Sequence, residues 1–442
     1  MRITLSLLVC VSVFAGVQCA SAQTARPCPP EVPNDARCFS DRDANGAVVL
    51  AAVPKNWSGI LIVHSHGGPR MTPIKPDAND KDLTRFSVFV REGHAWVNSS
   101  YRRPGYSAAM AVEDTENARR YFLDKIAPLV GKPKLVIAHG QSWGGNVAAK
   151  LIEMDAARPK QERAYNGALL TSAVLPGGAR GYWFRADLRA VYEYYCHNHP
   201  RPDEPQYVVA TGLPKGAKMS RKELRERVEA CTGAGKPAAE RSPEQAKALA
   251  NIAGVVKIRP SSIFGHMAWS TFLFQDLVQE RLGGRNPFSN IGVTYSGSSD
   301  DAALNAGVAR FASDPKAVAD LKADSQVTGK FDLPVVTVHA INDPTAFVEN
   351  ESAYRKIVDA AGNGDKLVQV FVDEAVHSKF HTPDYPAALN GLLAWIEHNK
   401  KPTAETIAAS CAPLSKTYNE TCTFVQGYKP AAYESRVPAR NP

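Results

Sequence analysis

The pentapeptide GQSWG at residues 140–144 constrains the fold of this chain more than any other segment. It follows an apolar run at 135–139 that is typical of a buried parallel strand, and it opens a run with helical character at 143–154. A serine between a strand and a helix sits on a sharp, strained turn, where side chains in place of the glycines would clash with both elements. The segment therefore predicts a strand–turn–helix unit that lifts the Ser142 hydroxyl above a sheet.

Apolar runs of strand length alternate with helical segments along most of the chain. Strands are expected at 47–53, 58–64, 94–100, 167–175, 333–339 and 367–372, and helices at 111–126 and 385–399. This alternation is typical of the α/β class, with a mostly parallel sheet flanked by helices. It stops at 176–330, where aromatic clusters and polar helical stretches replace it. We therefore expect one α/β domain, residues 23–175 and 331–442, with a large, mainly helical cap inserted at 176–330.

The first 22 residues differ from the rest of the chain. Arg2 precedes an almost uncharged apolar run, and the small residues at 20–22 resemble a cleavage site, so residues 1–22 are expected to be a secretory signal peptide. The mature protein is expected to be exported to the periplasm or the medium, without stable membrane insertion. The alternative is a membrane anchor.

The cysteines agree with export. Eight are present, and six remain once Cys10 and Cys19 leave with the signal peptide. The six fall into three close couples, Cys28 with Cys38, Cys196 with Cys231, and Cys411 with Cys422. We expect three local disulfides, because an oxidising compartment permits them. Free buried thiols are the alternative.

Charge and ligand patterns exclude several classes of function. The net charge of +8 is a mild excess over 442 residues, and no dense basic block carries interleaved aromatics, so nucleic acid is not expected as a partner. The run Cys196-His197-Asn198-His199 lacks a second ligand pair of matching spacing. We expect no metal and no cofactor.

A serine hydroxyl is a weak nucleophile and needs a base, which in turn needs an orienting carboxylate. Asp343 and His377 each lie just beyond the end of an expected strand, where catalytic groups gather in open α/β sheets. With Ser142 they follow the chain order nucleophile, acid, base. His381 competes as the base but lies further from the strand end, and Asp373 competes as the acid but is very near His377 in sequence.

The segment HSHGGP at residues 64–69 follows another expected strand and is a candidate oxyanion hole. A backbone N–H of this segment, together with the N–H of Trp143, would hold the negative charge of a tetrahedral intermediate. Pro69 has no N–H, so Gly68 is the first candidate and Gly67 the second.

These segments resemble the α/β-hydrolase superfamily, and more narrowly exported bacterial esterases and peptidases related to the prolyl-oligopeptidase catalytic domain. The resemblance rests on HSHGGP, on GQSWGG at 140–145, on HAINDP at 339–344 and on VHSKF at 376–380. It covers roughly residues 47–175 and 331–400. The cap and both cysteine-bearing ends lie outside it, and no β-propeller is expected before the domain, so a true prolyl oligopeptidase is not expected.

The resemblance implies a serine hydrolase that acts through a Ser-His-Asp triad and an acyl-enzyme. The aromatic cap and its lack of an acidic cluster favour a carboxylic ester, small or oligomeric, as the substrate. An exported peptidase or amidase is the alternative enzyme, and a catalytically inactive binding protein on the same scaffold is the alternative from another class. The acyl and alcohol groups and the oligomeric state stay open.

Overall fold

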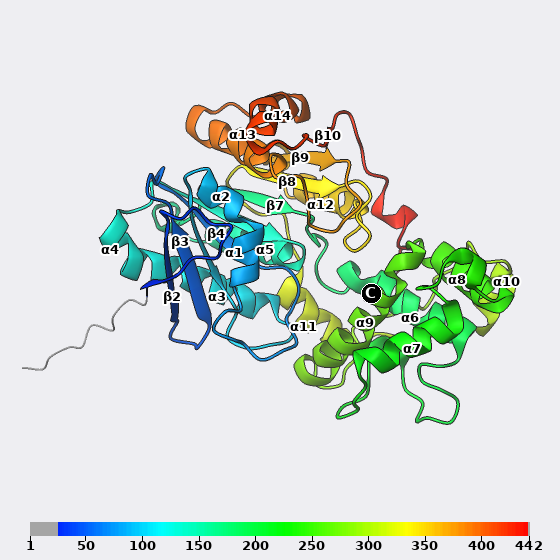
Figure 1. Cartoon of the computed structure of the whole chain (residues 1–442). Helices are drawn as coiled ribbons and strands as arrows, with labels where there is room; N and C mark the ends of the chain where they lie inside the picture. Colours follow the sequence, from blue (N-terminus) through cyan, green and yellow to red (C-terminus); the bar gives the residue numbers. More distant parts are fainter. Residues whose placement is uncertain (1–24, 441–442) are drawn as a thin grey trace, which may run out of the picture.

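The computed structural model, which describes residues 25–440, contains a ten-stranded sheet on one side and a group of helices on the other (Figure 1). The strand order is β1-β2-β3-β5-β4-β6-β7-β8-β9-β10, and the pairs from β5 to β9 are parallel. The parallel strands are β5 (Ala95–Ser99), β4 (Ile60–Ser65), β6 (Leu135–Gln141), β7 (Gly167–Thr171), β8 (Val335–Ala340) and β9 (Leu367–Val372). This mostly parallel sheet is the expected α/β-hydrolase arrangement. The expected signal peptide, residues 1–22, lies outside the described residues.

Both edges of the sheet are antiparallel. β1 (Ala25–Arg26) pairs with β2 (Arg37–Arg42), β2 pairs with β3 (Val48–Val53), and β3 pairs with β5. At the other edge β10 (Phe424–Val425) pairs with β9. The sequence indicated β3 but not β1, β2 or β10, because these three segments are short or mix charged and apolar residues.

Helices cover the two faces of the sheet and explain why its parallel strands are apolar throughout. Apolar side chains of β4 alternate between two core clusters, with Leu61 in one and Ile62 in the other. The first cluster includes residues of α3 (Ala108–Tyr121), α5 (Trp143–Ala156) and α12 (Glu349–Ala360). The second includes residues of α1 (Asp80–Arg85), α2 (Ser87–Arg91), α13 (Asp384–His398) and α14 (Ala404–Tyr418).

Two expected boundaries are wrong. The helix expected at 111–126 begins at Ala108, because the Ser107 side chain accepts from the Met110 N–H and caps it. It continues beyond 126, through a π-helical turn (Phe122–Ile126) into α4 (Ala127–Val130). The strand expected at 167–175 ends at Thr171, because Ser172 has a φ of 46° and turns the chain out of the sheet.

Between β7 and β8 the described chain holds helices and no strand. The α-helices are α6 (Trp183–Cys196), α7 (Arg221–Thr232), α8 (Pro243–Val256), α9 (Ile263–Ala268), α10 (Asp301–Gly307) and α11 (Pro315–Ser325). Two π-helical stretches, Trp269–Leu273 and Asp276–Arg281, follow α9. Helices α6–α10 form a group beside the sheet, here called the cap (Figure 1). The C-terminal segment, residues 419–440, contains β10 and then crosses from the sheet edge to the cap.

The three expected local disulfides are confirmed: Cys28–Cys38, Cys196–Cys231 and Cys411–Cys422. Each joins segments close in sequence, so each stabilises a local feature: the N-terminal strands, a helix pair of the cap, and the end of α14. Among residues 25–440, none of the helices is long and apolar enough to span a membrane.

Candidate active site

Ser142 occupies the turn between β6 and α5, with φ 58° and ψ −125°. A positive φ is a strained conformation for a residue with a side chain, and it persists only where the surroundings impose it. The Ser142 N–H donates to the Thr171 carbonyl at 2.9 Å, and the Ser142 carbonyl accepts from the Val174 N–H at 3.1 Å. The end of β7 therefore holds the serine backbone in place.

The glycines around Ser142 are required by close packing. A Cβ on Gly140 would lie 2.2 Å from the Gly144 carbonyl oxygen, and one on Gly144 would lie 2.1 Å from the Ser65 carbonyl oxygen. A Cβ on Gly145 would lie 2.3 Å from the Ala173 Cβ. Only glycine fits at these positions, which is the physical reason for the motif.

The structure brings the three sequence-predicted side chains together at the carboxyl edge of the sheet. His377 Nε2 lies 2.8 Å from Ser142 Oγ, and His377 Nδ1 lies 2.7 Å from Asp343 Oδ2. The three residues come from separate strand ends, after β6, β8 and β9. The Asp343 side chain is fully buried, whereas the His377 side chain is 20% exposed and remains reachable from solvent.

Asp343 is held as a carboxylate by its surroundings. Its Oδ1 accepts from the Thr345 N–H at 2.8 Å and from the Ala346 N–H at 2.9 Å, which fixes the turn after β8. Burial acts to raise the pKa of Asp343, but the charge of His377 and its hydrogen bond outweigh burial and keep that pKa below its ordinary value.

A second acid–histidine pair lies beneath Asp343 and was not indicated by the sequence. His339 Nδ1 lies 3.0 Å from Glu351 Oε1, and His339 Nε2 lies 2.7 Å from the Ala346 carbonyl and 3.9 Å from Asp343 Oδ2. Burial acts to lower the pKa of His339, but the hydrogen bond and charge of Glu351 raise it overall. This pair supports the turn that carries Asp343.

Ser378 was also missed. Its Oγ lies 3.2 Å from His377 Nε2, the same nitrogen that faces Ser142, and it accepts a hydrogen bond from Gln141 Nε2. Ser378 is buried and has a φ of 54°. The sequence offers no signal for this contact, because Gln141 and Ser378 are 237 positions apart.

The candidate oxyanion segment lies against the start of α5, as the contact of Gly144 with the Ser65 carbonyl shows. Gly68 has a φ of 61°, and the Ser142 side chain does not cap the first turn of α5. Among the loop and turn hydrogen bonds of residues 25–440, neither the Gly68 N–H nor the Trp143 N–H donates to a backbone carbonyl. At Gly67 the Gln141 side chain fills the space a Cβ would need, with Oε1 at 2.3 Å.

The competing residues lie elsewhere. His381 forms no hydrogen bond with Ser142 or Asp343. Its Nδ1 lies 2.7 Å from the Thr421 carbonyl oxygen, and its Nε2 lies 3.3 Å from Glu374 Oε1. Asp373 is exposed at the end of β9, where its N–H donates to the Thr423 carbonyl at 2.8 Å. The structure therefore places His381 and Asp373 with the C-terminal segment rather than with Ser142.

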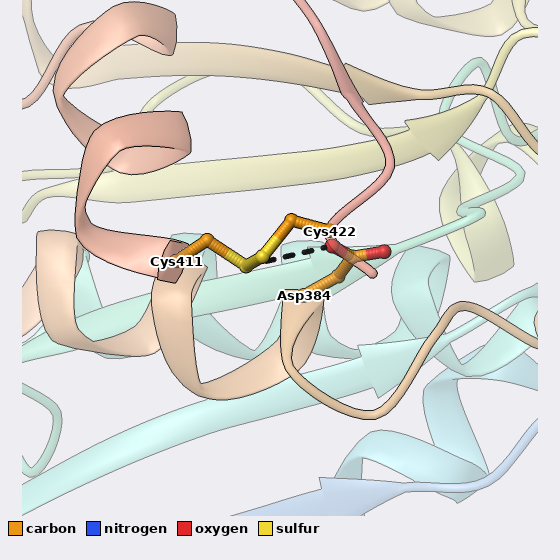
Figure 2. A group of neighbouring side chains, drawn as sticks. All are labelled: Asp384, Cys411 and Cys422. Atoms are coloured by element: carbon orange, nitrogen blue, oxygen red, sulfur yellow. Dashed lines mark hydrogen bonds between the residues drawn. A yellow bond between two sulfur atoms is a disulfide. The ribbon is translucent and has the colours of Figure 1, made fainter. Parts of the chain in front are cut away.

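In the described part of the chain, one cluster combines residue types that bind metals. It consists of Asp384, Cys411 and Cys422, drawn in Figure 2. A carboxylate oxygen of Asp384 and the two Sγ atoms lie within 4.8 Å of one another. Both sulfurs belong to the Cys411–Cys422 disulfide, so neither is a thiolate that could bind a metal. Asp384 instead accepts from the Thr423 hydroxyl at 2.6 Å. Cys196 is likewise in a disulfide, so its sulfur is not a free thiolate in the Cys-His run at 196–199.

Comparison with solved structures finds chains that match most of this one at low sequence identity. Feruloyl esterase B from Aspergillus oryzae is 13% identical over 83% of this chain and 81% of its own, with a TM-score of 0.44. The rice cell wall degrading esterase LipA from Xanthomonas oryzae is 11% identical over 83% and 90%, with a TM-score of 0.40. The acylaminoacyl peptidase of Pyrococcus horikoshii is 9% identical over 89% and 43%, with a TM-score of 0.38. No protein-family model and no curated protein matches the sequence.

Proposed function

We propose that this chain is a serine hydrolase of the α/β-hydrolase superfamily that cleaves carboxylic esters. Ser142 is the nucleophile, His377 the general base and Asp343 the orienting acid. The observation that carries the proposal is the continuous hydrogen-bonded relay from Asp343 Oδ2 through His377, with contacts of 2.7 Å and 2.8 Å, to Ser142 Oγ. Such a relay is the arrangement that activates a hydroxyl at neutral pH.

The relay implies an order of proton transfers. His377 Nε2 takes the proton of the Ser142 hydroxyl as Oγ attacks the ester carbonyl, and Asp343 stabilises the imidazolium that forms. His377 then gives that proton to the departing alkoxide, leaving an acyl group on Ser142. Water, deprotonated by His377, attacks the acyl-enzyme and releases the carboxylic acid, and the proton returns to Ser142.

The negative charge on the carbonyl oxygen during both attacks needs hydrogen-bond donors. We assign this role to the N–H groups of Gly68, in the segment after β4, and of Trp143, at the start of α5. The dipole of α5 adds to the effect, because the N-terminus of a helix favours negative charge.

The preference for an ester over a peptide bond rests on the cap. The side chains packed near the triad loop from the cap include Phe184 and His266, whose rings lie 4.6 Å and 5.8 Å from that of Phe347. These side chains are aromatic and largely apolar, as are the linings of many small-molecule pockets. A peptide substrate with a free N-terminus would need carboxylates to bind its ammonium group.

The test is covalent labelling with a fluorophosphonate, combined with turnover of p-nitrophenyl esters and aminoacyl p-nitroanilides. Label is expected on Ser142, and Ser142→Ala is expected to lose kcat by on the order of a million-fold while keeping its circular dichroism spectrum. Ser378→Ala is the matched control, because its Oγ also contacts His377 Nε2, and it should still be labelled. Label on Ser378, or full activity in Ser142→Ala, would refute the assignment. Faster turnover of the anilides than of the esters would favour the peptidase alternative.

We also propose that the chain is exported, as the expected signal peptide and the three disulfides suggest. N-terminal sequencing of the secreted protein should then begin at Gln23. A protein recovered from the cytoplasm with Met1 intact would contradict export.

A further inference from the structure

Among residues 25–440, Arg185 is a buried cation without a charged or hydrogen-bonded partner. It lies in α6 at 3% exposure, and its guanidinium carbon lies 4.4 Å from the ring centres of both Phe184 and Trp269 and 6.0 Å from that of Tyr182. Within the described residues, none of the three guanidinium nitrogens of Arg185 has a hydrogen-bond acceptor. The Nε atom is completely shielded from solvent, whereas the two Nη atoms keep some solvent contact. The five N–H donors of the group are therefore all unused.

The aromatic rings do not compensate this charge fully. Cation–π contacts offset part of the cost of removing a guanidinium from water, but buried charges in proteins are normally paired and hydrogen-bonded as well. The groups whose charge acts favourably on Arg185 are the phenols of Tyr182 and Tyr433, and no carboxylate of the described chain is among them. Burial lowers the pKa of Arg185 to about 10, so the side chain stays charged at neutral pH.

Two other buried arginines of the same region show how the fold normally satisfies such a group. Arg189, one turn further along α6, donates to the Val209 carbonyl at 3.2 Å and to the His199 carbonyl at 2.9 Å. Arg440 donates to both carboxylate oxygens of Asp187, at 2.9 Å and 2.5 Å. Arg185 is buried to the same degree and has neither kind of partner.

Contacts of its neighbours connect Arg185 with both the nucleophile turn and the turn of Asp343. Its ring neighbour Tyr182 contacts the Tyr106 hydroxyl at 3.1 Å, and the Tyr106 ring lies 5.6 Å from that of Trp143, the residue after the nucleophile. His266 Nε2 lies 2.9 Å from the Pro344 carbonyl, next to Asp343. Burial and, after it, the charge of Arg185 lower the pKa of His266 to about 3, so the cation acts on this neighbour.

We propose that Arg185 binds a carboxylate of the substrate, so that the preferred esters carry an anionic group in addition to the scissile bond. The inference rests on the proposed function and specifies its substrate class. A carboxylate can accept two parallel hydrogen bonds from a guanidinium, and the surrounding rings suit the apolar part of such an ester. Arg185 would thus determine specificity without taking part in bond cleavage.

The test compares esters matched in length. On the acyl side, 4-nitrophenyl hydrogen glutarate is compared with 4-nitrophenyl pentanoate, in which a methyl group replaces the carboxylate. On the alcohol side, 4-carboxyphenyl butyrate is compared with 4-methylphenyl butyrate. In Arg185→Gln, kcat/KM for the anionic ester of one pair should fall by about 100-fold, and for its neutral partner by less than about two-fold. The pair that responds identifies which side of the ester carries the anion.

The matched control is Arg225→Gln. Arg225 is an exposed cap arginine whose guanidinium lies 3.8 Å from the Phe264 ring centre, so its loss removes a similar contact away from the site. It should leave both pairs of esters unchanged. An equal loss for anionic and neutral esters in Arg185→Gln would overturn the proposal.

Stability gives a second readout. If Arg185 awaits an anion, Arg185→Met should keep or raise the Tm of the free protein, because it removes an unpaired buried charge. If Arg185 only supports the fold, Arg185→Met should lower the Tm.

A binding experiment distinguishes failure of the Arg185 proposal from failure of the proposed hydrolase function. Monomethyl glutarate should raise the Tm of Ser142→Ala, and Arg185→Gln in that background should abolish the rise, while methyl pentanoate should have no effect. Absence of the rise, together with no selective loss for 4-carboxyphenyl butyrate in Arg185→Gln, would overturn Arg185 as the anion site. Failure of the proposed function would instead appear as wild-type protein that cleaves none of the four esters.

Discussion

Arg440 and Asp187 form a buried ion pair that fastens the C-terminal segment to the first helix of the cap. The side chains are 0% and 4% exposed, and the Asp187 carboxylate also accepts from the Tyr295 hydroxyl at 2.7 Å. The pair joins residues 253 positions apart, so it connects the end of the chain, beyond the sheet edge at β10, with α6.

Breaking this pair should destabilise the cap, because one charge would stay buried without its partner. Arg440→Met is expected to cost about 3 kcal/mol of unfolding free energy, measured by urea denaturation. The double variant Arg440→Met, Asp187→Leu should recover part of the loss, since both charges are then gone. Lys222→Met is the control, because its ion pair with Glu226 is exposed, and it should leave the urea midpoint unchanged. No loss in Arg440→Met would show that the C-terminal segment does not hold the cap.

The two histidines after β9 should differ sharply in their effect on turnover. His377→Ala should nearly abolish kcat, because His377 is the group in contact with Ser142. Asp343→Asn should lower kcat by about 10⁴, since a neutral amide holds the imidazole in the wrong tautomer. His381→Ala should change kcat by only a small factor, because its partners are Thr421 and Glu374. A dead His381→Ala together with an active His377→Ala would reverse the roles.

Buried histidines should make the protein sensitive to mild acid. Burial lowers the pKa of His66, His139 and His266 to about 3 and that of His94 to about 4, all from an ordinary value of 6.5. Between the ordinary pKa of 6.5 and these lowered pKa values, the unfolded chain binds more protons than the folded chain. The contribution of these histidines to the free energy of unfolding is therefore fully present above pH 6.5 and is lost as the pH drops towards 3. Asp384, whose pKa burial raises to about 6, acts in the opposite direction, and so do Asp82, Asp114, Glu153 and Glu193, whose pKa burial also raises. Burial lowers the pKa of His64 and His199 as well, so these two histidines add to the loss of stability in acid.

The acid effect is measured as the urea midpoint at pH 7.5, 6, 5 and 4. His94→Gln should flatten the decline, because one of the groups that must gain a proton on unfolding is gone. The exposed His398→Gln is the matched control and should follow the wild-type curve. A urea midpoint that does not change between pH 7.5 and 4 would contradict the prediction.

Two cap tryptophans should behave differently when replaced by alanine. Trp269 stacks on Tyr182 at 4.8 Å and contacts Arg185, so Trp269→Ala should alter the ranking of p-nitrophenyl esters by chain length. Trp183 packs against Arg440, with 5.0 Å from the guanidinium to the ring centre, so Trp183→Ala should lower the Tm and leave the ranking unchanged. An unchanged ranking in a folded Trp269→Ala would remove this residue from the pocket.

Much of the sheet was predictable because its signals are local. A parallel strand that is buried on both faces is apolar throughout, so β4, β6 and β9 could be recognised from their own residues. The turn at Ser142 was equally recognisable, since its glycines answer clashes with the adjacent strand and helix. The cysteine couples were also close in sequence, and local pairing was the simplest outcome.

Other features depend on contacts between distant segments. β2 and β10 are strands because β3 and β9 offer them an edge, and their own composition does not mark them. The boundaries of the inserted segment, residues 176–330, remain a prediction, although the described chain between β7 and β8 is helical.

The sequence by itself determined which residue types stand at strand ends, and with them the candidates Ser142, Asp343 and His377, because parallel strands bring their carboxyl ends to one edge. Only the tertiary structure decided what surrounds them. The hydroxyl of Ser378 beside His377, Glu351 beneath Asp343 and the unpaired charge of Arg185 depend on packing between segments far apart in the chain. Burial and the presence or absence of a partner are properties of that packing, and no local pattern of residues encodes them.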